Sequence, residues 1–183
     1  MSSEWGPLEG LIGEWEGSGG MDTSYHHADG EIGDTPYLEK VTMKPFGPVD
    51  SGRQHLYGLD YKTAMWRDGE ENPFHTEVGY WLWDGETGEV LRAFVIPRGI
   101  AVLAGGTASA DAKEFTMKAA VGDERYPIAE GKYLGANASS VSFEVTIKIG
   151  ENTWSYDELT MLRMKEFDDL VAHPDRNTLT RVG

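Results

Sequence analysis

His75 and Glu77 share one face of an apolar segment, HTEVGYWLWD, with Trp81 and Trp83. Side chains alternate between the two faces of an extended strand, so these four residues point the same way. The pattern supports two interpretations. One is a structural hydrogen bond between the imidazole and the carboxylate near the rim of a sheet. The other is a polar group that orients a ligand inside an aromatic cavity, which is the usual form of a small-molecule site.

His173, in the segment DLVAHPDRNTLTRV, is the second residue that could do chemistry. It begins the last predicted strand or the turn before it, and a neutral imidazole is one of the side chains that ligate haem iron. His26 and His27 lie in a polar segment, TSYHHADGEIGD, that we expect to form a mobile loop, and His55 opens another strand. We find no nucleophile elbow, phosphate-binding loop or zinc-ligand spacing, so the catalytic residues stay unassigned.

Strands must position these residues, because alternation of apolar and polar residues is the clearest pattern in the chain. In VSFEVTIKIG the apolar residues fall on one face, and after a break at Glu151-Asn152 the pattern returns in TWSYDELTMLRM. Further strands are expected in PYLEKVTMKPF, QHLYGLDYKTAMWR, FHTEVGYWLWD, EVLRAFVIP, GIAVLAGGTAS and EFTMKAAV. The 23 glycines indicate tight turns between them. Only GPLEGLIG and KEFDDLVA are expected to form short helical turns.

Residues 1–183 are therefore expected to form one all-β domain of eight to ten consecutive antiparallel strands. Closure of such a meander into a barrel removes its exposed edges, and we prefer it to the alternative, a sandwich of two sheets. A barrel of this strand number can hold one small ligand. The glycines of Gly17-Ser18-Gly19-Gly20 are expected to let the first strand bend sharply.

The composition of the chain limits its partners. The net charge is −15, and acidic residues dominate the first forty residues, so nucleic acid and anionic membranes would be repelled. No apolar run is long enough for a membrane span and no export signal is evident, so we expect a cytoplasmic protein. The absence of cysteine excludes disulfides and thiolate metal sites. A barrel edge or mouth could support a homodimer.

The order of several motifs resembles that of the nitrobindin family, the haem-binding barrels that are similar to fatty-acid-binding proteins. PLEGLIGEWEGSGG looks like the family's opening Leu-rich turn and Gly-x-Trp-x-Gly-x-Gly, here Gly13, Trp15, Gly17 and Gly19. YLEKVTMKPFG is similar to the second strand of the family. HTEVGYWLWDGETGEVLRAFVIPRGIAVLAGG is similar to its central His-x-Glu-x-Gly-aromatic segment, and NTLTRV to its closing Leu-x-Arg-Val. The resemblance covers nearly the whole chain, in order.

The resemblance implies a ten-stranded antiparallel meander β-barrel, lipocalin-like, that holds ferric haem b near one mouth. Family members bind nitric oxide and are credited with isomerising peroxynitrite to nitrate. By this resemblance His173 is the candidate iron ligand, His75 lies by the haem pocket, and Trp15 and Trp81 help to line it. Arg98, in the segment IPRG, could meet a haem propionate or another carboxylate, and a surface position in the turn is the other interpretation.

The spacing near the C-terminus leads to one further expectation. His173 stands about one residue further from Leu179 than the family pattern has it, and Pro174 follows it. Because strand side chains alternate with a period of two, such a shift would turn His173 away from the cavity unless a β-bulge restores its direction.

Three functional hypotheses remain open. In the first, His173 coordinates ferric haem, and an open coordination site takes nitric oxide or peroxynitrite. In the second, the cavity carries an apolar carboxylate such as a fatty acid, or another small ligand, without a metal, and Arg98 or His75 pairs with the acid. In the third, the barrel has lost its ligand.

Overall fold

The computed structural model describes residues 3–183, and most of them belong to strands. The strands are β1 Gly13–His26, β2 Glu31–Ser51, β3 Gln54–Trp66, β4 His75–Asp84, β5 Glu89–Ile96, β6 Ile100–Thr107, β7 Glu114–Ala120, β8 Ile128–Glu130, β9 Ala138–Ile149, β10 Thr153–Met164 and β11 Val171–Arg181. The helical elements are the 3-10 helix η1 Gly6–Leu11 and the helix α1 Lys132–Asn137. Within residues 3–183, no helix has the length and hydropathy to cross a membrane.

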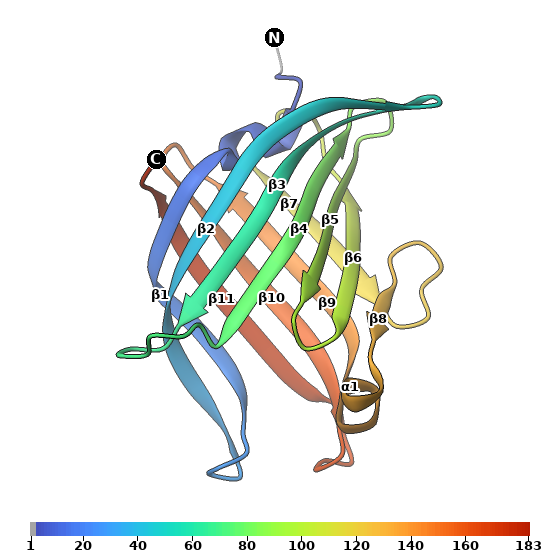
Figure 1. Cartoon of the computed structure of the whole chain (residues 1–183). Coiled ribbons are helices and arrows are strands. Elements are labelled where there is room, and N and C mark those ends of the chain that lie inside the picture. The colour runs from blue at the N-terminus through green and yellow to red at the C-terminus, as the bar shows by residue number, and fades with distance from the viewer. Residues whose placement is uncertain (1–2) are drawn as a thin grey trace.

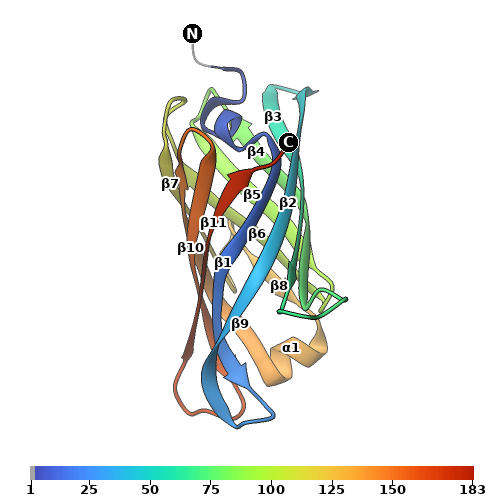
Figure 2. The ribbon, with the colours of Figure 1, turned by 90° about the vertical axis from the view of Figure 1, so that its left-hand side faces the viewer.

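Ten of the strands close into one antiparallel barrel (Figure 1 and Figure 2). Each strand from β1 to β7 pairs with the next, β7 pairs with β9, and β11 pairs back with β1. β6 and β7 are joined at Gly105 and Lys118, and the short β8 pairs with β6 at its other end. The prediction of a ten-stranded antiparallel meander barrel is confirmed, and the sandwich alternative is wrong.

The short helix η1 lies across one end of the barrel (Figure 1). Its Leu8 and Leu11 are fully buried, and the indole Nε1 of Trp15 donates a 2.8 Å hydrogen bond to the Leu11 carbonyl. The helical turn expected in GPLEGLIG is therefore present. The prediction of a helical turn in KEFDDLVA is wrong. A non-helical turn there leads directly into β11, where Val171 pairs with Leu162 of β10.

The polar segment TSYHHADGEIGD forms a hairpin instead of the expected loop. β1 and β2 remain paired as far as His26 and Glu31, and the hairpin extends past the neighbouring strands (Figure 1). Thr23 donates a 2.6 Å hydrogen bond to Asp34 across the hairpin. Gly30 closes the turn with a φ of 73°, a conformation that glycine adopts at little cost. Cross-strand pairing therefore overrides the polar, loop-like composition of this segment.

β1 contains a break in register between Gly17 and Gly20. Before the break the buried residues of β1 are odd-numbered, and after it they are even-numbered, so Asp22 turns inward. At the break the backbone lies close to the Tyr37 side chain. A β-carbon added at Gly20 would lie 2.2 Å from the Tyr37 ring. The bend expected at Gly17-Ser18-Gly19-Gly20 thus takes the form of a β-bulge.

The bulge predicts different effects for two neighbouring substitutions. Gly20→Ala would press a methyl group into the Tyr37 ring, and we expect it to lower the free energy of unfolding by about 1–3 kcal/mol. Gly19→Ala is the matched control: no atom lies within 4 Å of its added β-carbon, so we expect a change within about 0.5 kcal/mol. Urea unfolding measures both values. Equal free energies for the two variants would contradict the close approach at Gly20.

Candidate functional site

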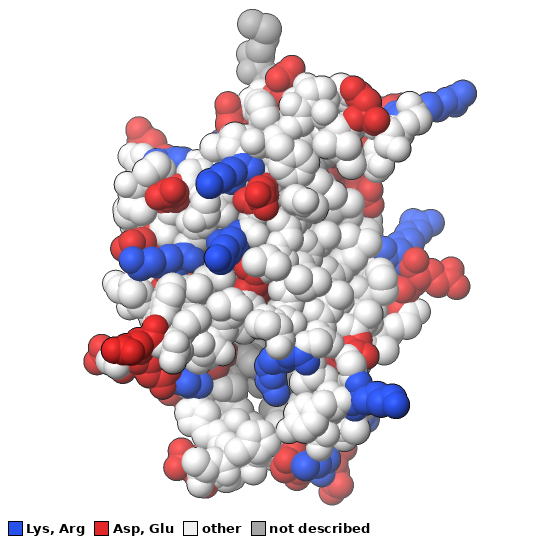
Figure 3. All heavy atoms as spheres, in the orientation of Figure 1, with Lys and Arg blue, Asp and Glu red and all other residues white. Residues whose placement is uncertain are grey.

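The end of the barrel opposite η1 opens into a cavity of about 340 Å³. Figure 3 shows the surface hollowed toward this end, with basic side chains beside the hollow. Part of the lining is apolar, with Phe94, Phe143 and Ile128 among its residues. The rest is polar or charged. A concave site that combines an apolar wall with a few polar groups is typical of small-molecule binding.

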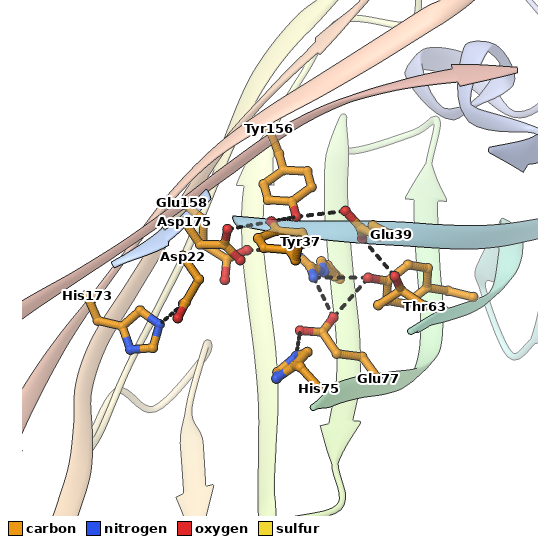
Figure 4. Close-up of polar contacts among 12 residues, drawn as sticks. Asp22, Tyr37, Glu39, Thr63, His75, Glu77, Tyr156, Glu158, His173 and Asp175 are labelled. Carbon is orange, nitrogen blue, oxygen red and sulfur yellow. Dashed lines mark hydrogen bonds and ion pairs between the residues drawn. The ribbon is translucent and has the colours of Figure 1, made fainter. Parts of the chain in front are cut away.

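A chain of ion pairs runs along the cavity from His75 to Glu158 (Figure 4). His75 Nε2 lies 3.0 Å from Glu77 Oε1, which is the hydrogen bond that the sequence suggested. Arg92 Nη2 donates to Glu77 Oε2 over 2.6 Å, and Arg92 Nη1 donates to Glu158 Oε2 over 3.1 Å. Glu77 and Arg92 are only 3% and 5% exposed. Buried charges of this kind are tolerated because each one has a partner of opposite sign.

Burial and ion pairing shift the pKa values of His75, Glu77 and Glu158 in different directions. Burial raises the pKa of Glu77, but the Arg92 charge and the His75 hydrogen bond outweigh it and hold the pKa at about 2. Glu158 shares an arginine that Glu77 already neutralises, so burial dominates and raises its pKa to about 7. Burial lowers the pKa of His75, yet its hydrogen bond to Glu77 leaves the pKa raised overall. Glu77 is therefore a carboxylate at neutral pH, whereas Glu158 is close to its midpoint.

A second hydrogen-bonded group surrounds Glu39, which is 1% exposed on the inner face of β2 (Figure 4). Its carboxyl group accepts hydrogen bonds from Thr63 over 2.7 Å and from Tyr156 and Asn177 over 2.9 Å. The Tyr156 hydroxyl lies 2.6 Å from that of Tyr37, which in turn donates to Asp175 over 2.5 Å. Burial raises the pKa of Glu39 and raises that of Asp175 to about 8. Asp175 is therefore mostly protonated at pH 7.

His173 lies against a carboxylate inside the cavity (Figure 4). Its Nε2 is 2.6 Å from Oδ1 of Asp22, on the neighbouring strand β1. Ser24 donates a 2.8 Å hydrogen bond to the other oxygen of the same carboxylate. Burial raises the pKa of Asp22, but the hydrogen bonds from His173 and Ser24 outweigh it, so the pKa lies below its usual value. The pair joins a charged carboxylate to the imidazole predicted as an iron ligand.

The orientation of His173 follows from the regular pairing of β11. β10 and β11 pair in one register from Thr153–Thr180 to Leu162–Val171. His173 and the fully buried Leu179 are an even number of residues apart, so both point inward. The expectation that the spacing turns His173 away from the cavity unless β11 bulges is wrong.

The residues predicted for the site lie at different depths. His173, His75 and Arg98 line the cavity. Trp15 and Trp81 do not, although we expected them to, because they are buried in the packed core nearer η1. The tryptophan that lines the cavity is Trp154, whose ring centroid lies 6.5 Å from that of Trp15 and 6.3 Å from that of Trp81.

Sequence reasoning missed several charged groups of the cavity: Asp22, Glu39, Arg67, Arg92, Glu158 and Asp175. Arg92 did carry a signal, because it shares a strand face with the buried Val90 and Phe94. An ionisable residue on an otherwise apolar face indicates a charge in the interior. Asp22 carried no such signal, because the β-bulge changes which face of β1 points inward.

The raised pKa values of Asp175 and Glu158 predict a stability that falls as pH rises from about 5 to 8. The pKa is about 8 for Asp175 and about 7 for Glu158 in the folded protein. In this pH range the folded protein therefore keeps protons that the same carboxyl groups have released in the unfolded chain. This stabilisation is complete below the unfolded pKa and is lost as pH rises through the folded pKa. Asp175→Asn cannot ionise, so its unfolding free energy should fall less steeply than that of the wild type, by up to about 1.4 kcal/mol per pH unit.

Urea unfolding at several pH values measures both slopes. Asp34→Asn, which removes an exposed carboxylate, is the control and should keep the wild-type slope. Parallel curves for Asp175→Asn and the wild type would contradict the assignment of a proton to Asp175.

Comparison with known proteins finds relatives with a shared name. The peroxynitrite isomerase of Clavibacter sepedonicus is 29% identical over 99 residues, which are 50% of this chain and 44% of that protein. The peroxynitrite isomerase of Renibacterium salmoninarum is 30% identical over 93 residues, which are 49% of this chain and 38% of that protein. The matched segments thus span less than half the length of these relatives.

The fold and the family are matched over the whole chain. The crystal structure of Rv2717c from M. tuberculosis has the same fold, with a TM-score of 0.70 at 20% identity, over 100% of this chain and 99% of that one. The family model described as THAP4-like, heme-binding beta-barrel domain matches residues 4–181. The resemblance to the nitrobindin family is confirmed, and the chain belongs to the THAP4-like, haem-binding β-barrel domain family.

Proposed function

We propose that this chain binds ferric haem b in the open end of its barrel, with His173 as the iron ligand. The position of His173 carries the proposal. Its side chain is 31% exposed and lines the cavity of a barrel that belongs to a haem-binding family. A histidine on one side of the iron, with the other side open, is the arrangement found in haem proteins that bind small gaseous ligands.

The residues that line the cavity together with His173 fit this cofactor. Phe94, Phe143 and Ile128 supply an apolar wall for the macrocycle. Arg67 and Arg98 also line the cavity, and their guanidinium groups suit the propionates. The fit therefore extends over three chemical features of haem, which are the iron, the ring and the carboxylates.

The proposed activity is isomerisation of peroxynitrite to nitrate, together with binding of nitric oxide. Bound haem iron would supply this chemistry. The residues of the chain would orient the cofactor and exclude bulk water, because η1 covers one end of the barrel and leaves the opposite end for entry. His75, fixed by its hydrogen bond to Glu77, would present an imidazole to a ligand in the cavity. The name of the Clavibacter and Renibacterium relatives supports the choice of peroxynitrite.

A metal-free carrier of a fatty acid is the alternative, and the charges in the cavity argue against it. The buried cation, Arg92, already pairs with Glu77 and Glu158. A fatty-acid carboxylate in the interior would therefore meet carboxyl groups and no uncommitted arginine. Its head group would have to bind at Arg67 or Arg98 instead, and its chain would have to lie against the charged residues.

Titration with hemin tests the proposal. We expect a saturable Soret band with the wild type, and at least about tenfold weaker binding with His173→Ala, because the iron loses its protein ligand. His26→Ala is the control, because this imidazole bonds to Thr35 outside the cavity lining. A free-hemin spectrum that stays unchanged in the presence of folded protein would contradict haem binding. Equal hemin affinities of the wild type and His173→Ala would contradict the assignment of His173 as the iron ligand. Displacement of a fluorescent fatty-acid probe tests the alternative.

We also propose that two copies of the chain associate through the outer face of β4 and β5. Val78, Tyr80 and Val95 are about half exposed there, and Val78 pairs with Val95 across the two strands. Figure 3 shows few charged side chains over these strands. An isologous contact would bury this apolar face while keeping most of the −15 charge of each copy at a distance.

Light scattering after size-exclusion chromatography measures the association. We expect a dimer for the wild type and a monomer for Tyr80→Glu, which places a charge in the contact. A wild-type monomer at micromolar concentration would contradict the proposed interface.

A further inference from the structure

We propose that Asp22 competes with haem iron for Nε2 of His173, so that the ligand-free protein holds its iron ligand in a carboxylate pair that must open when haem binds. This inference rests on the proposed function. The pair is tight, with 2.6 Å between Nε2 and Oδ1 of Asp22. Asp22 is 9% exposed, so little water is available to replace the bond.

The backbone of β1 holds Asp22 in place for this contact. The register break between Gly17 and Gly20 turns Asp22 inward, and Asp22 then stands opposite Asp175 on β11. His173 lies two residues from Asp175 on the same face, which is the diagonal position across a strand pair. The hydrogen bond from Ser24 fixes the second carboxylate oxygen. The acceptor is therefore positioned before any cofactor arrives.

The nitrogen that Asp22 holds is the one that iron needs. In histidine, Nδ1 is next to Cγ, the ring atom that is joined through Cβ to the main chain. A large planar macrocycle would therefore meet the backbone if its iron approached Nδ1. Nε2 lies on the far side of the ring and can reach the centre of the macrocycle. In this structure Nε2 is bonded to Asp22. A metal-bound histidine that used a carboxylate as support would instead offer it the nitrogen that does not bind the metal.

Hemin binding by Asp22→Asn tests the competition. The neutral amide forms a weaker hydrogen bond than the carboxylate, so His173 should be released more readily and hemin should bind about tenfold more tightly, with faster association in stopped-flow absorbance. Asp22→Ala removes the acceptor and should bind at least as tightly as Asp22→Asn. Asp34→Asn makes the same charge change at an exposed site on β2 that does not contact His173, and should match the wild type. An affinity of Asp22→Asn equal to or below that of the wild type would overturn the inference.

A second measurement uses the protein without hemin. Diethyl pyrocarbonate modifies a free imidazole nitrogen, and mass spectrometry locates the modified histidine. We expect modification of His173 at Nε2, distinguished from Nδ1 by NMR of the modified protein, to be about tenfold faster in Asp22→Asn than in the wild type or in Asp34→Asn, because the pair no longer blocks this nitrogen. Equal rates in the three proteins would show that Asp22 does not restrain the ring, and would overturn the inference.

The two proposals fail in different ways. If the proposed function is wrong, neither the wild type nor Asp22→Asn develops a Soret band, whatever the rate of modification of His173, and both proposals fall. If only the competition is wrong, the wild type and Asp22→Asn bind hemin with the same affinity, and His173→Ala still weakens binding.

Discussion

Pairing of the first long strand with the last is the constraint on which the rest of this structure depends. β1 and β11 are joined from Trp15–Arg181 to Asp22–Asp175, and this contact closes the barrel. Closure joins the first and last long strands, so each inward side chain must either fill the interior or line the cavity. It also brings Asp22 to His173 across 151 residues of sequence. The cavity and its chemistry therefore exist only in the closed barrel.

The interior of the barrel has two ends of different character. Toward η1, buried tryptophans and leucines fill the interior, and this end supplies hydrophobic stabilisation. Toward the mouth, Arg92 forms ion pairs with both Glu77 and Glu158, and further carboxyl groups line the cavity. An apolar replacement for such a buried ionic group is often neutral or stabilising, so the charges are weak contributors to stability. Their location around an open cavity favours a role in ligand binding.

Alternation along the sequence predicted the fold well because a strand in a barrel has one inner and one outer face. VSFEVTIKIG became β9 with the expected face inward, and the succession of such strands predicted the barrel. Alternation gives the face of a residue but not its height along the barrel axis. Trp15 and Trp81 were therefore placed on the correct face, yet they lie in the packed end instead of the cavity.

The errors at the site have specific physical causes. The direction of His173 was judged against a family spacing, whereas its even separation from Leu179 within this chain already indicated the inward face. Asp22 could not be predicted, because the bulge at Gly17–Gly20 shifts the period of β1 by one residue, and the pairing of β1 with β2 and β11 is needed to reveal it. The polar hairpin at His26 was hidden by its loop-like composition, since its stability comes from cross-strand contacts.

The proposed function rests on the binding of haem iron by His173 inside this barrel. The most direct measurement is a crystal structure of the hemin-reconstituted protein, with anomalous scattering recorded at the iron absorption edge. We expect one iron peak within the cavity, at bonding distance from a nitrogen of His173. A peak bound to His26, His27 or His55, or haem stacked on the outer surface with the cavity unchanged, would contradict it.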